Sequence, residues 1–255
     1  MSAVLAFSNQ KGGVGKTTSA VNIAAALGME GYSVLLVDAD PQGNATSGVG
    51  VSKRRLTGTL YTALSGEGGA ETAVVETGFE NLSLLPSQID LAACEVELAS
   101  LDNREGRMRT LLDPLREKYD FILIDCPPSL GLLTINALAA SDGVIIPMQC
   151  EYFALEGLSQ LSETISRVRS VYRPSLSITG ILITMYNGRL NLSLQVLAEI
   201  KKYYGKLLLK TPIPRNVRLS EAPSYGKPIG YYDRYSPGGI AYRLAAQEIA
   251  ARAGK

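Results

Sequence analysis

The sequence predicts an α/β fold, in which a doubly wound and mostly parallel sheet is covered by helices on both faces. Two observations support this prediction. Near-continuous apolar runs, as expected of strands buried on both faces, alternate with helical stretches along the whole chain. The first apolar run leads into a glycine-rich loop and then a helix, which is the context that a phosphate-binding loop requires. We expect a single domain over residues 1–255.

The first half of the chain supplies three of the expected strands. They are the apolar runs Val4–Phe7, Ser33–Asp38 and Leu82–Leu85. Helices are predicted over residues 17–27, 89–101 and 105–118. The glycine-rich segment Ser65–Gly69 is expected to form an exposed loop.

The second half continues the alternation. Its expected strands are Phe121–Asp125, Gly143–Pro147 and Ile178–Tyr186. Its expected helices span residues 130–140, 154–172, 191–204 and 239–252. In a doubly wound sheet, ligands bind at the carboxyl ends of the strands, so the residues that follow each strand are the first candidates for a site.

The loop after the first strand reads Asn-Gln-Lys-Gly-Gly-Val-Gly-Lys-Thr-Thr over residues 9–18. Its end, Gly15-Lys16-Thr17, matches the end of the common phosphate-binding pattern, but Gln10 stands where that pattern has glycine. Glycines let backbone N–H groups approach phosphate oxygens, and a helix N-terminus favours the negative charge. The predicted nucleotide-binding residues of the loop are Lys11, Gly12, Gly13, Val14, Gly15, Lys16, Thr17 and Thr18.

Two residues of this loop have specific expected roles. Lys16 can reach the β- and γ-phosphates, and the Thr17 hydroxyl can take one position on Mg²⁺. The second lysine, Lys11, has little to pack against in its own subunit because its neighbours are glycines. We expect it to reach the phosphates of a nucleotide held by a second subunit, in the role that an arginine finger fills elsewhere.

Acidic residues end two of the predicted strands. Asp125 ends the strand Phe121–Asp125 and is expected to lie close to Mg²⁺, bound directly or through water. Asp38 and Asp40 follow the second strand, and one of them is expected to face the attacking water in a phosphoryl transfer. The predicted catalytic residues are Lys11, Lys16 and Asp40.

Composition narrows the class of protein. The chain has no histidine, which excludes histidine catalysis and histidine metal ligands. Its three cysteines, Cys94, Cys126 and Cys150, form no C-x-x-C pair, which favours a reducing cytoplasm and argues against a zinc site. No apolar run is long enough to span a membrane, and residues 1–8 lack the features of a signal peptide.

Charge is distributed unevenly along the chain. Residues 1–200 hold 14 Lys/Arg against 21 Asp/Glu, whereas residues 201–255 hold 11 against 3. A basic segment of this kind is a possible electrostatic footprint for nucleic acid or an anionic membrane. If dimerisation brought the basic surfaces of two subunits together, the number of phosphate contacts would roughly double, and the affinity for DNA would depend steeply on salt concentration.

Several motifs together resemble the ParA/Soj family of DNA-segregation ATPases, over nearly the whole chain. They are the loop 11–18, Val37-Asp-Ala-Asp-Pro-Gln-Gly-Asn-Ala-Thr46, Ile124-Asp-Cys-Pro-Pro-Ser129, Glu151-Tyr-Phe-Ala-Leu-Glu-Gly157, Thr184-Met-Tyr-Asn-Gly-Arg189 and Ile213-Pro-Arg-Asn-Val-Arg-Leu-Ser-Glu-Ala-Pro223. The second and last of these look most like chromosomal Soj. The resemblance implies a single P-loop ATPase domain without an N-terminal helix-turn-helix extension.

The resemblance also implies activity and partners. Family members bind ATP and Mg²⁺, form a nucleotide-sandwich homodimer, and then bind double-stranded DNA without sequence preference. A ParB/Spo0J-type centromere-binding partner stimulates their slow hydrolysis and releases the DNA. These properties imply a cytoplasmic, nucleoid-associated protein that partitions a chromosome or a plasmid.

The motifs assign expected roles by position. Lys11 falls on the lysine that acts across the dimer, Asp40 on the position that activates water, and Thr17 on the Mg²⁺ ligand. The adenine pocket draws on residues matching Asn187, Pro214, Arg215 and Asn216. The motifs predict DNA contacts at Arg189 and Arg218, and the basic C-terminal segment adds Lys227 and Arg243 to the expected DNA contacts.

Three alternatives share parts of this pattern. A MinD-like membrane ATPase needs a bulky amphipathic C-terminal helix, but residues 243–255 offer mainly alanine, with Leu244 and Ile249. An iron–sulfur carrier would use Cys94 and Cys126, which lack the expected glycine-rich surroundings. A metabolic kinase would need an acceptor pocket that these residues do not indicate. We expect no membrane association.

Overall fold

The structure is a computed structural model that describes residues 2–255. Within these residues, seven strands form one sheet in the order β3-β4-β2-β5-β1-β6-β7. The strands are β1 (Ala3–Phe7), β2 (Val34–Asp38), β3 (Val75–Glu76), β4 (Leu82–Leu85), β5 (Phe121–Asp125), β6 (Gly143–Met148) and β7 (Ser177–Ile183). Neighbouring strands pair in parallel, except that β3 is antiparallel to β4.

Five helices of nine or more residues account for most of the helical structure in the described part of the chain. These are α1 (Lys16–Met29), α7 (Leu132–Ala140), α8 (Ala154–Val171), α9 (Asn191–Tyr204) and α12 (Pro237–Arg252). The shorter helices are α2 (Asn44–Gly48), α3 (Leu60–Ser65), α4 (Ala70–Ala73), α5 (Cys94–Glu97), α6 (Arg107–Leu112), α10 (Val217–Glu221) and α11 (Ile229–Tyr232). The 3₁₀ turns are η1 (Lys53–Arg55), η2 (Ile89–Ala93), η3 (Leu98–Ser100), η4 (Asp113–Glu117) and η5 (Ala222–Tyr225).

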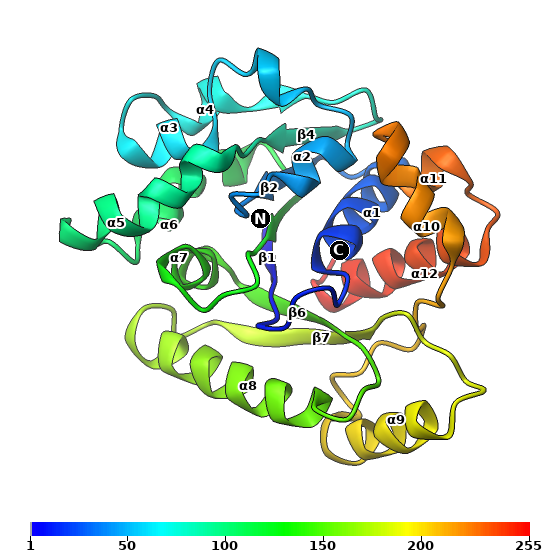
Figure 1. Ribbon diagram of the computed structural model, residues 1–255. Helices are drawn as coiled ribbons and strands as arrows, with labels where there is room; N and C mark the ends of the chain where they lie inside the picture. The colour runs from blue at the N-terminus through cyan, green and yellow to red at the C-terminus, as the bar shows by residue number, and fades with distance from the viewer. Residues whose placement is uncertain (1) are drawn as a thin grey trace.

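The sheet separates two hydrophobic cores. Alternate residues of β1 enter different cores, with Val4 and Ala6 on one face and Leu5 and Phe7 on the other. Figure 1 shows α1, α11 and α12 together on one side of the sheet, and α7 and α8 on the other. The predicted fold class, a doubly wound and mostly parallel sheet with helices on both faces, is confirmed.

Most predicted elements are present, and three of them differ in their extent or type. The predicted helix 89–101 is a run of η2, α5 and η3, in which a single α-helical turn lies between two 3₁₀ turns. The predicted helix 105–118 changes from α6 to η4 near Pro114, which has no N–H to donate. The strand predicted over 178–186 stops at Ile183, and Met185 has a positive φ of 49°.

Gly28 on α1 makes a close approach that fixes the position of this helix on the sheet. A Cβ at Gly28 would lie 2.3 Å from the backbone oxygen of Glu80. We therefore expect Gly28→Ala to lower the free energy of unfolding by about 1–3 kcal/mol, because the backbone must move to remove the overlap. Urea denaturation of the variant and the wild type measures this difference.

The control for this substitution is a helical glycine with room around it. A Cβ at Gly157 on α8 would meet no atom within 4 Å. We expect Gly157→Ala to raise the free energy of unfolding by about 0.5–1 kcal/mol, since alanine is the better helix former. Equal effects of the two substitutions would contradict the steric explanation for Gly28.

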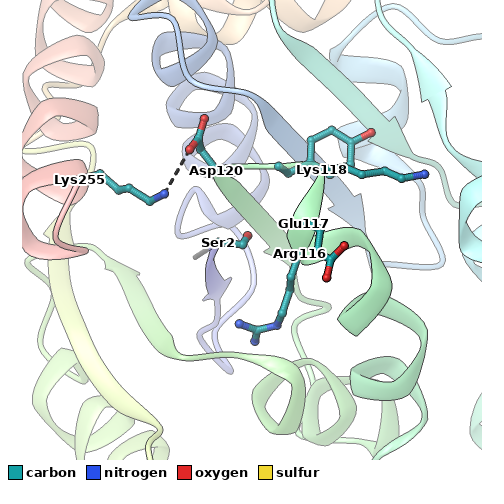
Figure 2. A pocket seen from close by; sticks show the side chains of 7 residues that line it. Ser2, Arg116, Glu117, Lys118, Asp120 and Lys255 are labelled. Carbon is teal, nitrogen blue, oxygen red and sulfur yellow. Dashed lines mark hydrogen bonds and ion pairs between the residues drawn. The ribbon is translucent and has the colours of Figure 1, made fainter.

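A wide hollow of about 560 Å³ lies at the amino ends of β1 and β5, at the edge opposite the carboxyl ends of the strands. Its lining includes Arg116, Lys118 and Lys255, and Figure 2 shows Lys255 paired with Asp120. The Lys255 Nζ–Asp120 Oδ1 distance is 3.1 Å, Arg116 pairs with Asp142, and Lys118 pairs with Glu71. Because its cations already have carboxylate partners, this hollow is not the candidate site.

The C-terminal helix packs on the domain. The buried face of α12 includes Tyr242, Ala245 and Ile249 and belongs to the same core as α1, whereas Leu244 is exposed. No helix in residues 2–255 is both long enough and apolar enough to cross a bilayer.

Candidate functional site

The strand register brings three chain segments together at the carboxyl edge of the sheet. Asp125 at the end of β5 lies opposite Phe7 of β1 on one side and Asp38 of β2 on the other. The chain leaves Phe7 directly into the glycine-rich loop, so the loop begins beside both carboxylates. The predicted site therefore forms where the rule for doubly wound sheets places ligands.

The glycine-rich loop has the backbone shape that its sequence requires. Gly13 and Gly15 have φ angles of 73° and 84°, a region that only glycine adopts at little cost. A Cβ at Gly12 or Gly13 would meet no protein atom within 4 Å. The loop thus offers backbone donors to open space, as expected of a phosphate cradle.

Lys16 begins α1 and is almost fully buried, with 6% of its surface exposed. Its Nζ donates a hydrogen bond to the backbone oxygen of Lys11 at 3.1 Å, so the side chain folds back across the loop. Burial lowers the pKa of the Lys16 ammonium, although the nearby Asp125 and Asp40 carboxylates favour its charged form. The structure thus brings Lys16, Asp125 and Asp40 together.

Asp125 is fully buried, and among residues 2–255 neither of its carboxylate oxygens has a partner in good hydrogen-bond geometry, although the Thr17 hydroxyl lies nearby. Burial and the neighbouring Asp38 carboxylate raise the pKa of Asp125 well above its ordinary value, and the Thr17 hydroxyl and Lys16 only partly oppose this. Buried carboxylates without partners are rare and call for an explanation. A hard cation next to Asp125 and the Thr17 hydroxyl fits this oxygen donor set, which is the kind that Mg²⁺ prefers.

The two acidic residues at the carboxyl end of β2, Asp38 within the strand and Asp40 after it, differ in their surroundings. Asp38 is fully buried, and its Oδ2 accepts hydrogen bonds from both the backbone N and the hydroxyl of Thr46 at 2.7 Å. Burial raises the pKa of Asp38 to about 6, while the Thr46 hydrogen bonds act in the opposite direction. Asp40 is 8% exposed and its Oδ1 accepts one bond, from the backbone N of Gln42 at 2.9 Å. Asp38 is occupied in holding the loop, which leaves Asp40 as the better candidate to face water.

The surroundings of Lys11 differ from those predicted. Its side chain is half exposed, as the glycine neighbours suggest, but it forms an ion pair with Glu151 of its own chain. The expectation that Lys11 finds little to contact in its own subunit was therefore wrong. This pair could not be predicted from the sequence, because Glu151 lies 140 residues from Lys11, on the segment between β6 and α8.

Two further polar residues support the loop and were not predicted as site residues. Gln149 follows β6, and its Nε2 donates to the backbone oxygen of Gly13 at 2.9 Å. Thr184 follows β7, and its hydroxyl donates to the backbone oxygen of Val14 at 2.7 Å. Both are the first residues after apolar strands, a position in the sequence that could have identified them.

The segments predicted for the adenine pocket lie side by side. Tyr186 and Pro214 form an isolated parallel bridge, in which the backbone N of Tyr186 donates to the oxygen of Ile213 at 2.9 Å. This bridge places Asn187 next to Pro214 and Arg215. The side-chain oxygen of Asn216 accepts from the backbone N of Arg218 at 2.8 Å and caps α10, so this side chain has a local structural role.

Sequence comparison identifies relatives of the whole chain. A family model described as an AAA domain matches residues 2–178. The chain is 52% identical over 251 residues to the sporulation initiation inhibitor protein Soj of Bacillus subtilis, covering 98% of this chain and 99% of that protein. It is 51% identical over 249 residues to the chromosome partitioning protein ParA of Myxococcus xanthus, covering 98% and 88%. The chain belongs to the ParA/Soj family.

A solved structure supports the same assignment of fold. Cobyrinic acid a,c-diamide synthase from Mycobacterium smegmatis, with a bound ATP analogue and magnesium, matches with a TM-score of 0.86 and 40% identity. The match covers 97% of this chain and 93% of that chain. The resemblance to the ParA/Soj family that the motifs carry is confirmed, and so is the P-loop fold.

The four residues predicted to contact DNA occupy different parts of this ParA/Soj chain. Arg189 is exposed in the turn before α9, and Lys227 is exposed after η5. Arg218 on α10 pairs with Glu221 at 2.9 Å, and its Nε lies 3.6 Å from the Asp233 carboxylate. These carboxylates offset the charge of Arg218.

Arg243 lies on the C-terminal helix α12. It lines a hollow of about 440 Å³ between α1, α11 and α12, together with Met29 and Glu30 at the far end of α1 from the glycine-rich loop. Arg234 lines the same hollow and lies over the ring of Tyr235, with 4.6 Å between the guanidinium carbon and the ring centroid. Arg243 and Lys227 were predicted as DNA contacts from the basic composition of residues 201–255, whereas Arg189 and Arg218 were predicted from the motifs.

Proposed function

We propose that this chain is an ATP-dependent partition ATPase whose ATP-bound homodimer binds double-stranded DNA without sequence preference. The observation that carries the proposal is the arrangement of two lysines on one loop. Lys16 is buried beside Asp40 and Asp125, where a triphosphate would meet it, while Lys11 remains half exposed at the rim. A buried lysine serves its own site, and an exposed one can serve a partner subunit.

The chain's own residues have these proposed roles in hydrolysis. Backbone donors of residues 12–15 and the Lys16 ammonium hold the phosphates of ATP, and Thr17 and Asp125 hold Mg²⁺, directly or through water. Asp40 orients the water that attacks the γ-phosphorus, so that the bond to the β-γ bridging oxygen breaks and ADP and phosphate leave. Mg²⁺, when bound, neutralises charge on the phosphates. Asn187, Pro214, Arg215 and Asn216 contact the adenine.

Lys11 must leave Glu151 to reach the phosphates in a partner subunit. Both side chains of this ion pair are about half exposed, at 50% and 48%. Exposed ion pairs contribute at most about 1 kcal/mol, so the pair is easily exchanged for a contact with a polyphosphate. We infer that dimerisation includes this exchange, and that hydrolysis by the isolated protein is slow.

The partners follow from the family. Soj of Bacillus subtilis and ParA of Myxococcus xanthus are described as a sporulation initiation inhibitor and a chromosome partitioning protein. We propose a ParB/Spo0J-type partner that stimulates hydrolysis, and a nucleoid-associated protein in the cytoplasm. The MinD-like alternative receives no support from α12, because two of its four bulky apolar side chains, Tyr242 and Ile249, are buried in the domain and only Ile240 and Leu244 are exposed.

The test measures binding to duplex DNA of mixed sequence with ATP, with ADP and without nucleotide, for the wild type and for Arg189→Ala. We expect ATP alone to support tight binding by the wild type. Arg189→Ala should dimerise with ATP but bind DNA about tenfold more weakly or worse, because an exposed phosphate contact is lost from each subunit. Sedimentation reports the dimer and fluorescence anisotropy reports the DNA.

A charge-matched control is Arg169→Ala on α8, which removes an exposed arginine outside the predicted DNA contacts. It should change neither dimerisation nor DNA binding. If the wild type bound DNA equally well with ATP, with ADP and without nucleotide, or bound no DNA under any condition, the proposed ATP-dependent DNA binding would be excluded.

A further inference from the structure

The 3₁₀ turn η1 places three basic residues in a row at the surface, beside the segment that follows β2. Arg54 and Arg55 are exposed, and neither forms an ion pair with a carboxylate anywhere in residues 2–255. Two adjacent guanidinium groups repel each other, and no carboxylate of residues 2–255 lies within ion-pair distance of either one. Such an uncompensated pair favours an anionic ligand.

Two hydrogen bonds of Lys53, one from its side chain and one to its backbone oxygen, hold the backbone of η1 in a defined position. The Lys53 Nζ donates a hydrogen bond to the backbone oxygen of Gln42, and the Gln88 Nε2 donates to the backbone oxygen of Lys53 at 2.6 Å. Gln42 in turn donates its backbone N to Asp40. The turn is therefore anchored to the loop that carries Asp40, rather than being a loose surface segment.

A close backbone contact joins this turn to a distant part of the sequence. A Cβ at Gly50 would lie 2.9 Å from the backbone oxygen of Gly226, and a Cβ at Gly226 would lie 2.7 Å from the Cα of Gly50. Both glycines have positive φ angles, of 74° and 61°. The turn η1 follows Gly50 by a few residues, and the exposed Lys227 directly follows Gly226. The contact between the two glycines therefore brings these basic residues to the same side of the molecule.

The charge on this side differs from what the basic C-terminal segment alone suggests. Arg218 belongs to the same region through α10 and η5, but its guanidinium is engaged by Glu221 and Asp233. The arginines of η1 have no such partners. Arg54 and Arg55 therefore add uncompensated positive charge from residues 1–200, where acidic residues outnumber basic ones, to that of the basic tail.

We propose that Arg54 and Arg55, together with Lys227, contact the backbone phosphates of duplex DNA. The proposal rests on the proposed function and adds a contact surface to it. Guanidinium groups form bidentate hydrogen bonds with phosphate oxygens, and phosphate contacts of this kind carry no sequence preference. Two hydrogen bonds, from Lys53 to Gln42 and from Gln42 to Asp40, connect η1 to the loop of Asp40. DNA bound at η1 would therefore contact a segment that is bonded to the proposed site of hydrolysis.

The test compares the wild type with the double variant Arg54→Ala/Arg55→Ala in ATP, by titrating mixed-sequence duplex DNA at several salt concentrations. We expect binding about 10- to 100-fold weaker at 0.1 M salt. The slope of log K against log[salt] should become shallower by about 2 for each subunit that contacts the DNA, since each lost phosphate contact removes about 0.9. ATP-dependent dimerisation should be unchanged.

Two further variants make the outcome specific. Arg54→Lys/Arg55→Lys keeps the charge and should keep most of the salt slope, which excludes misfolding as the cause. Arg167→Ala/Arg169→Ala removes two exposed arginines from α8 and should leave the slope unchanged. A double alanine variant of η1 that binds like this α8 control, while the wild type binds DNA only with ATP, would overturn the inference and leave the proposed function standing. A wild type that binds no DNA would overturn both.

Discussion

Replacing Asp40 with alanine should lower the rate of ATP hydrolysis by about 10²- to 10⁴-fold and leave ATP binding intact. Asp40 is the less enclosed of the two carboxylates after β2, with a single hydrogen bond from Gln42, so it is available to a water molecule. The protein should therefore remain in its ATP-bound, DNA-binding form. Release of phosphate under single-turnover conditions, with DNA binding followed in parallel, measures both effects.

The control for Asp40→Ala is the same substitution at Asp38. Asp38 accepts two hydrogen bonds from Thr46 and one from the backbone N of Asp40 at 3.3 Å, so its loss should loosen the loop and lower thermal stability. Hydrolysis by Asp40→Ala at the wild-type rate would show that another group positions the water. Equal losses of stability in the two variants would show that Asp40 also has a mainly structural role.

Replacing Lys16 with alanine should abolish tight ATP binding, with an expected loss of at least about 100-fold in affinity. The Lys16 ammonium is buried at the start of α1, and a charge-assisted bond to phosphate in such a place is much stronger than one at the surface. Isothermal titration of the variant with ATP and Mg²⁺ measures the loss.

The matched comparison is Lys11→Ala, which removes a lysine from the other end of the same loop. This variant should bind ATP as a monomer with nearly wild-type affinity, yet fail to form the ATP-dependent dimer, because the Lys11 side chain points to Glu151 and the exterior. If Lys11→Ala lost ATP affinity as severely as Lys16→Ala, Lys11 would serve the nucleotide of its own subunit and the proposal of action across the dimer would fail.

The fold could be predicted from the sequence wherever burial alone determines the pattern. The strands β2, β5 and β6 are covered on both faces, so their runs are almost wholly apolar and are easily recognised. The short helices were missed because local capping and tertiary contacts define them. Thr59 and Thr62 cap α3 reciprocally, and Asn216 caps α10, in segments too short for a helical period to show.

In the candidate site, too, the residues that are contiguous in sequence could be predicted and the contacts between distant residues could not. The glycine-rich loop is contiguous in sequence, and its lysines and threonines were all identified from the motif. Its supporting contacts join residues more than a hundred positions apart, as in the bonds from Gln149 and Thr184 and the ion pair of Glu151. These contacts depend on how β1, β6 and β7 are ordered in the sheet, and a single sequence does not specify that order.

The start of α1 has a consequence for the stability of the whole protein. This helix has Gly15 in the left-handed conformation at its N-cap, no side chain that accepts a hydrogen bond there, and no acidic residue in its first turn. In α3, α10 and α12 a side-chain oxygen at the N-cap accepts one of these N–H groups, whereas α1 leaves its own to water or to an external anion. Any anion that binds there shifts the folding equilibrium toward the native state by RT ln(1 + [L]/Kd), or about 2.7 kcal/mol at a concentration of 100 Kd. The melting temperature of this protein should therefore rise with the concentration of nucleotide, because the bound phosphates cap a helix that has no capping side chain of its own.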